Sequence, residues 1–158
     1  MANRTNYRVI MPIHIPRHTS PDHHFESLWL ECTNLIARGT SRDAYEIPGH
    51  PDKVLKVSNR QSNFSNWMEI LVYEQFKARD ELAEIFSWSW SGRFVVMERL
   101  TPLSPDDLLS YTFPFYLTDR KPENYGKNAS GKIKALDYAM LVIDTPQDYF
   151  GTITLGKT

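Results

Sequence analysis

Asp119-Arg120-Lys121-Pro122-Glu123-Asn124 is the stretch that decides the fold of this chain, together with Asp137-Tyr138-Ala139 downstream. Its polar side chains stand at fixed separations: Asn124 follows Asp119 by five residues, and Asp137 follows Asn124 by thirteen. Asn124 and Asp137 carry the amide and carboxylate oxygens that hard divalent cations prefer as ligands. Taken alone, each piece would also fit a surface turn or the end of a strand, so the order and the spacing carry the interpretation.

The two motifs resemble the catalytic loop and the metal-binding triplet of protein kinases. The second motif departs from the family at Tyr138-Ala139, where kinases have phenylalanine and glycine. The resemblance implies that Asp119 orients the attacking hydroxyl and accepts its proton, and that Lys121 steadies the transferring phosphate. It also implies that Asn124 and Asp137 bind magnesium.

Upstream, Val54-Leu55-Lys56-Val57 resembles the third-strand lysine motif of the same family. The resemblance implies that Lys56 lies beside the α- and β-phosphates of ATP and is held there by a helix glutamate. Glu69 is the favoured partner because it leads an apolar helical face, whereas Glu74 fits a solvated face. The alternative interpretation of Lys56 is a charge on an edge strand that discourages aggregation.

The resemblance is weakest in the loop that covers the phosphates in kinases. Residues 37–45 keep only the middle glycine of the family pattern, Gly39. Side chains at the other two glycine positions restrict how closely backbone amides approach phosphates. We expect the polar run 40–42, with Ser41 at its centre, to compensate. Glu98 falls where the resemblance places the interlobe hinge, which offers backbone groups to adenine.

Hydrophobic periodicity predicts an α+β fold. Strands are expected at 7–11, 35–37, 44–47, 53–57, 85–90, 93–98, 113–117 and 132–136, and helices within 25–35, at 66–79 with Asn66 as cap, and at 104–111. Three strands, a helix and two strands is the order of the small lobe of a protein kinase. The sequence therefore predicts a kinase-like small lobe, an antiparallel sheet plus one helix, with a much reduced large lobe carrying the catalytic loop.

The lengths of the segments limit the large lobe. We expect an irregular arm at 1–24 and one minimal kinase-like domain at 25–158, divided into a small lobe at 25–100 and a remnant of the large lobe at 101–158. Only 19 residues follow Ala139, too few for the activation segment and the lower helices of the family. Apolar residues beneath the catalytic loop are expected to be covered by a C-terminal strand at 152–155, a partner protein or a second copy. These residues are Phe113, Phe115, Leu141, Val142 and Tyr149.

The bulk composition excludes several classes of protein. The 158 residues are 41% hydrophobic and 23% charged, which is typical of one ordinary globular domain. A formal net charge of −1 argues against a nucleic-acid or membrane-surface role. No signal-peptide pattern is apparent and no run approaches the ~20 apolar residues of a membrane span, so we expect a cytoplasmic protein.

Cysteine and histidine suggest no further chemistry. Cys32 is the single cysteine and is expected to be a packed, inert thiol. Four of the five histidines fall within the first 24 residues. His14 and His18 stand four residues apart, but Pro16 lies between them, and neither has acidic or thiol residues at metal-binding spacing.

Two functions fit these observations. The first is a minimal phosphotransferase that uses ATP and magnesium, because all six catalytic and binding side chains are present. They are Lys56, Glu69, Asp119, Lys121, Asn124 and Asp137. The second is a catalytically silent kinase-like module that engages or inhibits a partner protein, because Leu117-Thr118 replaces the usual histidine and arginine and the loop glycines are depleted. In style, the chain resembles prokaryotic or bacteriophage kinase-like proteins.

Overall fold

The computed structural model describes residues 13–139 of the chain. The strands expected at 7–11 and 152–155 lie outside this range. The chain forms two compact units: unit 1 consists of the residues up to Asn63 together with Ile85–Arg99, and unit 2 consists of Phe64–Glu84 and the residues from Leu100 onward. Within 13–139, no helix is both long enough and apolar enough to cross a membrane.

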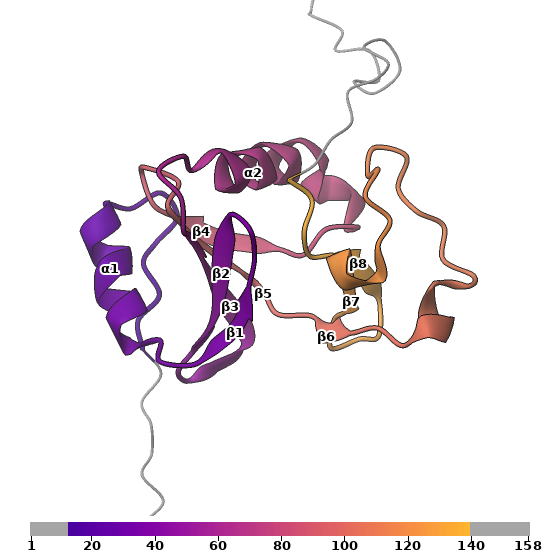
Figure 1. The fold of residues 1–158 in the computed structure, drawn as a ribbon, viewed down its shortest axis with the longest axis horizontal. Helices are drawn as coiled ribbons and strands as arrows, with labels where there is room; N and C mark the ends of the chain where they lie inside the picture. Colours follow the sequence, from indigo (N-terminus) through magenta and orange to yellow (C-terminus); the bar gives the residue numbers. More distant parts are fainter. Residues whose placement is uncertain (1–12, 140–158) are drawn as a thin grey trace, which may run out of the picture. The chain divides into compact units, whose positions relative to one another are not determined.

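Unit 1 is built on a five-stranded antiparallel sheet with the strand order β1-β2-β3-β5-β4 (Figure 1). The strands are β1 (Leu35–Arg38), β2 (Arg42–Ile47), β3 (His50–Ser58), β4 (Ile85–Trp88) and β5 (Phe94–Glu98). Phe94 to Met97 of β5 are fully buried, as expected for an apolar run in the interior of a sheet. The nine-residue β3 lies between β2 and β5, so its side chains are held from both sides.

Helix α1 (Asp22–Glu31) supplies part of the core of unit 1. Phe25 is fully buried and stacks on Phe94, with ring centroids 6.0 Å apart. The helix begins two residues before the expected end of the irregular arm at residue 24. Pro21 stands at its N-cap position, and the acidic Asp22 in the first turn favours a helix start because it complements the positive end of the helix dipole. The Asp22 carboxylate also accepts a hydrogen bond from the Ser91 amide at 3.0 Å, which ties the start of α1 to the β4–β5 turn.

The connection from β2 to β3 is shorter than expected. The sequence suggested a loop over 48–52, whereas Ile47 pairs with His50 across a two-residue turn of Pro48 and Gly49. Gly49 has φ 80°, and proline followed by a glycine with positive φ is the pattern of a type II turn. β3 therefore begins at His50, earlier than the strand expected from residue 53.

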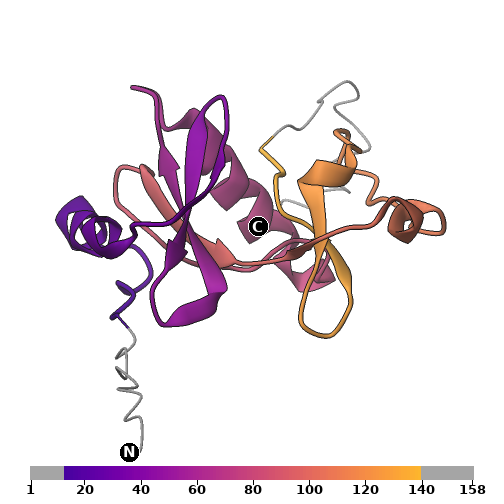
Figure 2. The ribbon, with the colours of Figure 1, turned by 60° about the horizontal axis from the view of Figure 1, so that its bottom comes forward.

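Unit 2 contains helix α2 (Phe64–Phe76), which continues into the 3-10 turn η1 (Lys77–Arg79). Its small sheet has the order β6-β7-β8, with β6 (Thr101–Pro102), β7 (Tyr125–Lys127) and β8 (Ile133–Ala135). Figure 2 shows β7 and β8 as the orange hairpin. Two further 3-10 turns, η2 (Pro105–Leu108) and η3 (Pro122–Asn124), complete the described elements.

The α+β prediction and the order of strands and helix in the first hundred residues are confirmed. Three details in unit 2 were wrong. Asn66 is not a helix cap, because α2 begins at Phe64 and Asn66 lies buried inside it. The segment 104–111 forms only the 3-10 turn η2, although the expected capping box of Ser104 and Asp107 is present. Residues 113–117 form no strand, and the partner of β8 is β7.

The backbones of β6 and β7 approach each other closely at Gly126. Pro102 pairs with Gly126, and a Cβ atom added at Gly126 would lie 2.5 Å from Cβ of Leu100 and 2.8 Å from the Thr101 carbonyl oxygen. Only glycine leaves this space. The start of β7 is thereby fixed directly after residues 119–124.

Candidate functional site

The predicted site residues are divided between the two units. Unit 1 carries Gly39, Ser41, Lys56 and Glu98, and unit 2 carries Glu69, Asp119, Lys121, Asn124 and Asp137. Each set has its own local geometry.

The β7–β8 hairpin brings Asn124 and Asp137 together. Tyr125 pairs with Ala135 at the open end of the hairpin, so the residues on either side of it become neighbours. The amides of Leu136 and Asp137 both donate to the carbonyl oxygen of Asn124, at 2.8 and 3.4 Å. A separation of thirteen residues in the sequence is therefore closed by one short hairpin.

The catalytic-loop motif folds onto itself around the 3-10 turn η3. Proline at its first position has the fixed φ that a helical turn needs, and the Asn124 amide donates to the Lys121 carbonyl at 3.0 Å. The side-chain amide of Asn124 donates through Nδ2 to the Asp119 carbonyl at 3.4 Å. Lys121 Nζ lies 3.6 Å from Oδ2 of Asp119. Asp119, Lys121 and Asn124 thus form one local cluster, and their catalytic and metal-binding roles stay predictions.

No group of three or more His, Cys, Asp or Glu side chains suited to a metal ion occurs within residues 13–139. Asn124 and Asp137 offer a different donor set, one amide oxygen and one carboxylate. Magnesium is commonly bound by one or two such side chains together with phosphate oxygens and water. The pair therefore fits a metal that arrives with a nucleotide better than a permanently bound ion.

Glu69 is completely buried on α2. Its Oε1 atom accepts a hydrogen bond from the amide of Tyr138, the residue after Asp137, at 3.4 Å. Glu74, in contrast, is exposed and forms an ion pair with Lys77 at 2.8 Å. The expected difference between the two glutamates is confirmed, whereas the pairing of Glu69 with Lys56 stays a prediction.

Lys56 lies on β3 with only 8% of its surface exposed. Its cross-strand neighbours are Ala44 on β2 and Val95 on β5, so the residue is in the interior of the sheet. The interpretation as an edge-strand charge is wrong for this reason. Burial of an ammonium group is costly and is typical of a lysine with a specific role.

The loop between β1 and β2 is held by two residues that the sequence did not indicate. The carbonyl oxygens of Gly39, Thr40 and Ser41 all accept hydrogen bonds from Asn59 and Arg60, which follow β3. The donors are Asn59 Nδ2 to Gly39 at 3.1 Å, Arg60 Nε to Thr40 at 2.8 Å and the Asn59 amide to Ser41 at 3.0 Å. These contacts span about twenty residues of sequence and leave no local pattern.

Gly39 closes the same loop on its other side. Its amide donates to the Arg42 carbonyl at 2.8 Å, and a Cβ atom at this position would lie 2.9 Å from that oxygen. Gly39 is thus required by the hairpin itself. Glu98, at the end of β5, pairs with Lys53 across the sheet and is half-buried. Its proposed contact with adenine stays a prediction.

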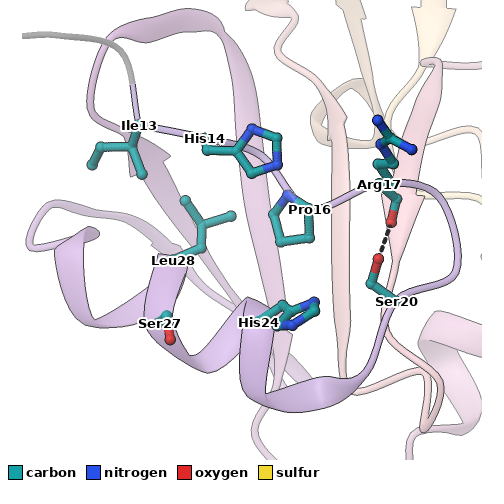
Figure 3. Close-up of a pocket in the computed structure, with 8 residues that line it drawn as sticks. All are labelled: Ile13, His14, Pro16, Arg17, Ser20, His24, Ser27 and Leu28. Atoms are coloured by element: carbon teal, nitrogen blue, oxygen red, sulfur yellow. Dashed lines mark hydrogen bonds between the residues drawn. The ribbon is translucent and has the colours of Figure 1, made fainter.

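Unit 1 also contains a cavity of about 460 Å³ (Figure 3). It is lined by Ile13, His14, Pro16, Arg17, Ser20, His24, Ser27 and Leu28. In Figure 3, Pro16 is drawn between the two imidazoles and Arg17, and the Ser20 hydroxyl is turned to the Arg17 carbonyl, to which it donates at 2.7 Å. The cavity contains none of the predicted site residues.

Cys32 is a structural thiol, as expected. It is 4% exposed, and its Sγ donates to the Leu28 carbonyl at 3.3 Å. Burial, with a smaller contribution from the charge of Glu31, raises the pKa of the thiol to about 11. The reactive thiolate is therefore scarce at neutral pH.

Neither a protein-family model nor a curated protein sequence matches this chain. Among solved structures, it is similar to the apo GRMZM2G135359 pseudokinase, with a TM-score of 0.47 and 10% identity over 82% of this chain and 61% of that one. It is also similar to the bifunctional kinase-methyltransferase WbdD, with a TM-score of 0.41 and 15% identity over 68% and 31% of the two chains.

A third similar structure is the ternary complex of APH(2″)-IIa with streptomycin and ATP, with a TM-score of 0.36 and 19% identity over 54% and 33% of the two chains. All three are kinase-like structures. This chain spans less than two thirds of the length of each. Identities this low concern the fold alone.

Proposed function

We propose that this chain is a minimal phosphotransferase of the kinase type that uses ATP and magnesium. The observation that carries the proposal is the closure of the β7–β8 hairpin, which places Asn124 and Asp137 side by side directly after the loop that contains Asp119. Phosphoryl transfer depends chiefly on positioning and on charge neutralisation, and these three side chains would supply both.

Asn124 and Asp137 would hold the magnesium ion. The Nδ2 atom of Asn124 is directed at the Asp119 carbonyl, so its Oδ1 atom is the group left for a cation. The ion would neutralise charge on the phosphate oxygens and orient the nucleotide. Asp137 adds the carboxylate that strengthens binding of a hard cation.

Asp119 would act as the base. Its side chain is 31% exposed, so an acceptor hydroxyl from solvent could reach it. As the hydroxyl oxygen forms its bond to the γ-phosphorus and the bond to ADP breaks, the hydroxyl proton passes to Asp119. Lys121 Nζ, 3.6 Å from that carboxylate, would offset the negative charge of the transferring group.

We propose that the unit 1 residues act on the same nucleotide. Lys56 would neutralise the α- and β-phosphates with Glu69 as its partner, and Glu98 would mark the segment whose backbone binds adenine. The loop with Gly39 and Ser41 would cover the phosphates. Ser41 is half-buried in a loop whose carbonyl groups are already engaged, which favours a fixed rather than a mobile cover.

Thermal unfolding with and without MgATP tests the binding step. We expect MgATP to raise the midpoint of the wild-type chain and to leave that of Asp137→Asn unchanged, because a ligand stabilises only the folded state that binds it. Asp106→Asn is the matched control, since Asp106 is an exposed carboxylate of the same unit outside the motifs. Absence of any shift in the wild type would refute the proposal.

Transfer of labelled phosphate tests the chemical step. The wild type should label itself or an added acceptor, and Asp119→Asn should lose at least the 10²-fold that a general base contributes. Equal labelling by both proteins would rule out Asp119 as the base. ATP analogues that cannot transfer the γ-phosphate serve as the negative control.

A second candidate is a catalytically silent kinase-like module that engages or inhibits a partner protein. The loop favours it, because the Gly39 amide is engaged within its own hairpin at 2.8 Å rather than left to meet a phosphate. The same two experiments separate the candidates: the silent module gives no phosphate transfer, whether or not it binds the nucleotide.

We also propose that a protein partner or a second copy covers the reduced large lobe. Leu109 is 83% exposed and Phe115 49% exposed in unit 2, and exposed apolar side chains that gather into a patch mark an interaction surface. Leu141, Val142 and Tyr149 lie outside the described residues. Sedimentation of the purified chain distinguishes a dimer from a monomer that needs a partner. From the sequence patterns we also propose that the protein is cytoplasmic, and from its resemblance to kinase-like proteins that it is of prokaryotic or bacteriophage type.

A further inference from the structure

We infer that Tyr138 locks the metal-binding segment of this chain in place before any nucleotide arrives. The inference rests on the proposed function only in naming Asp137 as a metal ligand. Its starting point is a departure from the family, because a tyrosine stands where the resemblance expects phenylalanine.

The additional hydroxyl of Tyr138 is engaged. Tyr138 is 1% exposed, and its hydroxyl donates to the carbonyl oxygen of Ala83 at 2.9 Å. Most buried tyrosine hydroxyls have a hydrogen-bond partner, and for Tyr138 the partner is a backbone group of a residue that is itself fully buried. A phenylalanine would fill the same space without this link.

The segment that contains the acceptor Ala83 is hydrogen-bonded to the β7–β8 hairpin, next to the proposed metal ligands. The Ala83 amide donates to the Ala135 carbonyl at 2.7 Å, and the Ala135 amide donates to the Glu81 carbonyl at 2.9 Å. Leu82 forms a parallel bridge with Ala135. Residues 81–83 thus run beside β8. The hydroxyl of Tyr138, three residues after Ala135, donates to the same segment.

The backbone of the segment is held as well. The amides of Leu136 and Asp137 donate to Asn124, and the amide of Tyr138 donates to the buried carboxylate of Glu69 at 3.4 Å. Three consecutive amides therefore have acceptors, and the tyrosine hydroxyl adds a fourth anchor. A backbone movement that takes Asp137 out of this position would break the hydrogen bond of the buried Tyr138 hydroxyl. Leaving a buried hydroxyl without its acceptor is unfavourable.

Amide hydrogen exchange of the full chain without nucleotide, measured residue by residue by NMR, tests the lock. In Tyr138→Phe, we expect the amides of residues 136–138 to exchange roughly threefold to tenfold faster than in the wild type, the range that one hydrogen bond of ordinary net strength gives. The ring that fills the core is retained, so the variant keeps its fold.

Tyr125→Phe is the matched control. Tyr125 is equally buried, at 1% exposure, but within residues 13–139 its hydroxyl has no hydrogen-bond partner. Exchange at 136–138 should stay the same in this variant. Unchanged exchange in Tyr138→Phe, or the same acceleration in both variants, would overturn the inference. The experiment uses no nucleotide, so its result does not depend on whether the chain binds MgATP. A failure of this inference can therefore be told apart from a failure of the proposed function.

Discussion

The buried carboxylate of Glu69 shows how much a single side chain contributes to unit 2. It is fully buried and accepts the hydrogen bond of the Tyr138 amide at 3.4 Å. Glu69→Ala leaves that amide without its acceptor, and we expect the free energy of unfolding to fall by about 1–3 kcal/mol. Glu69→Gln keeps an acceptor oxygen and should lose less. Urea unfolding measures both.

Glu74 on the same helix is the control for this comparison. It is exposed, and its ion pair with Lys77 at 2.8 Å is of the type that contributes only about 0.2–0.5 kcal/mol on a helix surface. Glu74→Ala should therefore change stability little. Equal losses for the two alanine variants would contradict the buried position of Glu69.

Asp107 contributes to the pH dependence of the stability of unit 2. The ion pair with Lys127 and the hydrogen bonds with Ser104 lower the pKa of its carboxyl to about 2. Because the folded pKa lies below the unfolded value of about 3.9, the contribution is present above pH ~4 and is lost as the pH falls toward 2. Asp107→Asn should thus be less stable than the wild type at pH 5 and equally stable below pH 2, as measured by thermal unfolding across this range.

At the scale of elements, the loop between β1 and β2 depends on residues beyond β3. Asn59 and Arg60 hold the carbonyl groups of residues 39–41. If this loop covers the phosphates, Asn59→Ala should weaken ATP binding several-fold while the thermal midpoint of the free protein changes little, because the donor is an exposed side chain. Titration with a fluorescent ATP analogue measures the affinity.

Asn63→Ala provides the comparison for Asn59. Its Nδ2 atom also donates to a backbone carbonyl, that of Ser91, at 3.0 Å, but outside the loop. ATP affinity should be unchanged in this variant. A loss of affinity as large as that of Asn59→Ala would mean that the loop contacts have no specific role.

Elements with long periodic patterns were predictable from the sequence, and short ones were not. The apolar run of β5 and the strand around Lys56 stand out because many residues follow one pattern. Strands β6 and β7 have only two and three residues, which is too few for a period. The aromatic run at 113–117 suggested a strand, but Phe113 instead packs edge to face against Tyr125, with centroids 5.2 Å apart.

The residues of the candidate site likewise fall into those that the sequence could indicate and those that it could not. Asp119, Asn124 and Asp137 were predictable because their spacing is set by one loop and one hairpin, and both are local. Asn59 and the Tyr138 hydroxyl were not, because their contacts bridge 20 and 55 residues of sequence. Such contacts arise from packing, which a single sequence does not display.

At the scale of the whole molecule, the predicted site residues belong to two units. If the proposed phosphotransferase uses both sets on one nucleotide, that nucleotide should protect both units. We expect MgATP to slow amide hydrogen exchange in β3 around Lys56 and also in the β7–β8 hairpin near Asp137. Ligand binding lowers the population of open states wherever the ligand is contacted. Exchange measured by mass spectrometry resolves the two regions.

Two substitutions, one in each unit, make this last experiment decisive. Lys56→Met removes the buried cation of β3, and Asp137→Asn removes the carboxylate of the hairpin. If residues of both units act on one nucleotide, each substitution abolishes protection in both regions, because the binding energy is shared. Protection that disappears only in the unit carrying the substitution would instead indicate two independent sites, and the proposed phosphotransferase would then lack the arrangement that transfer requires.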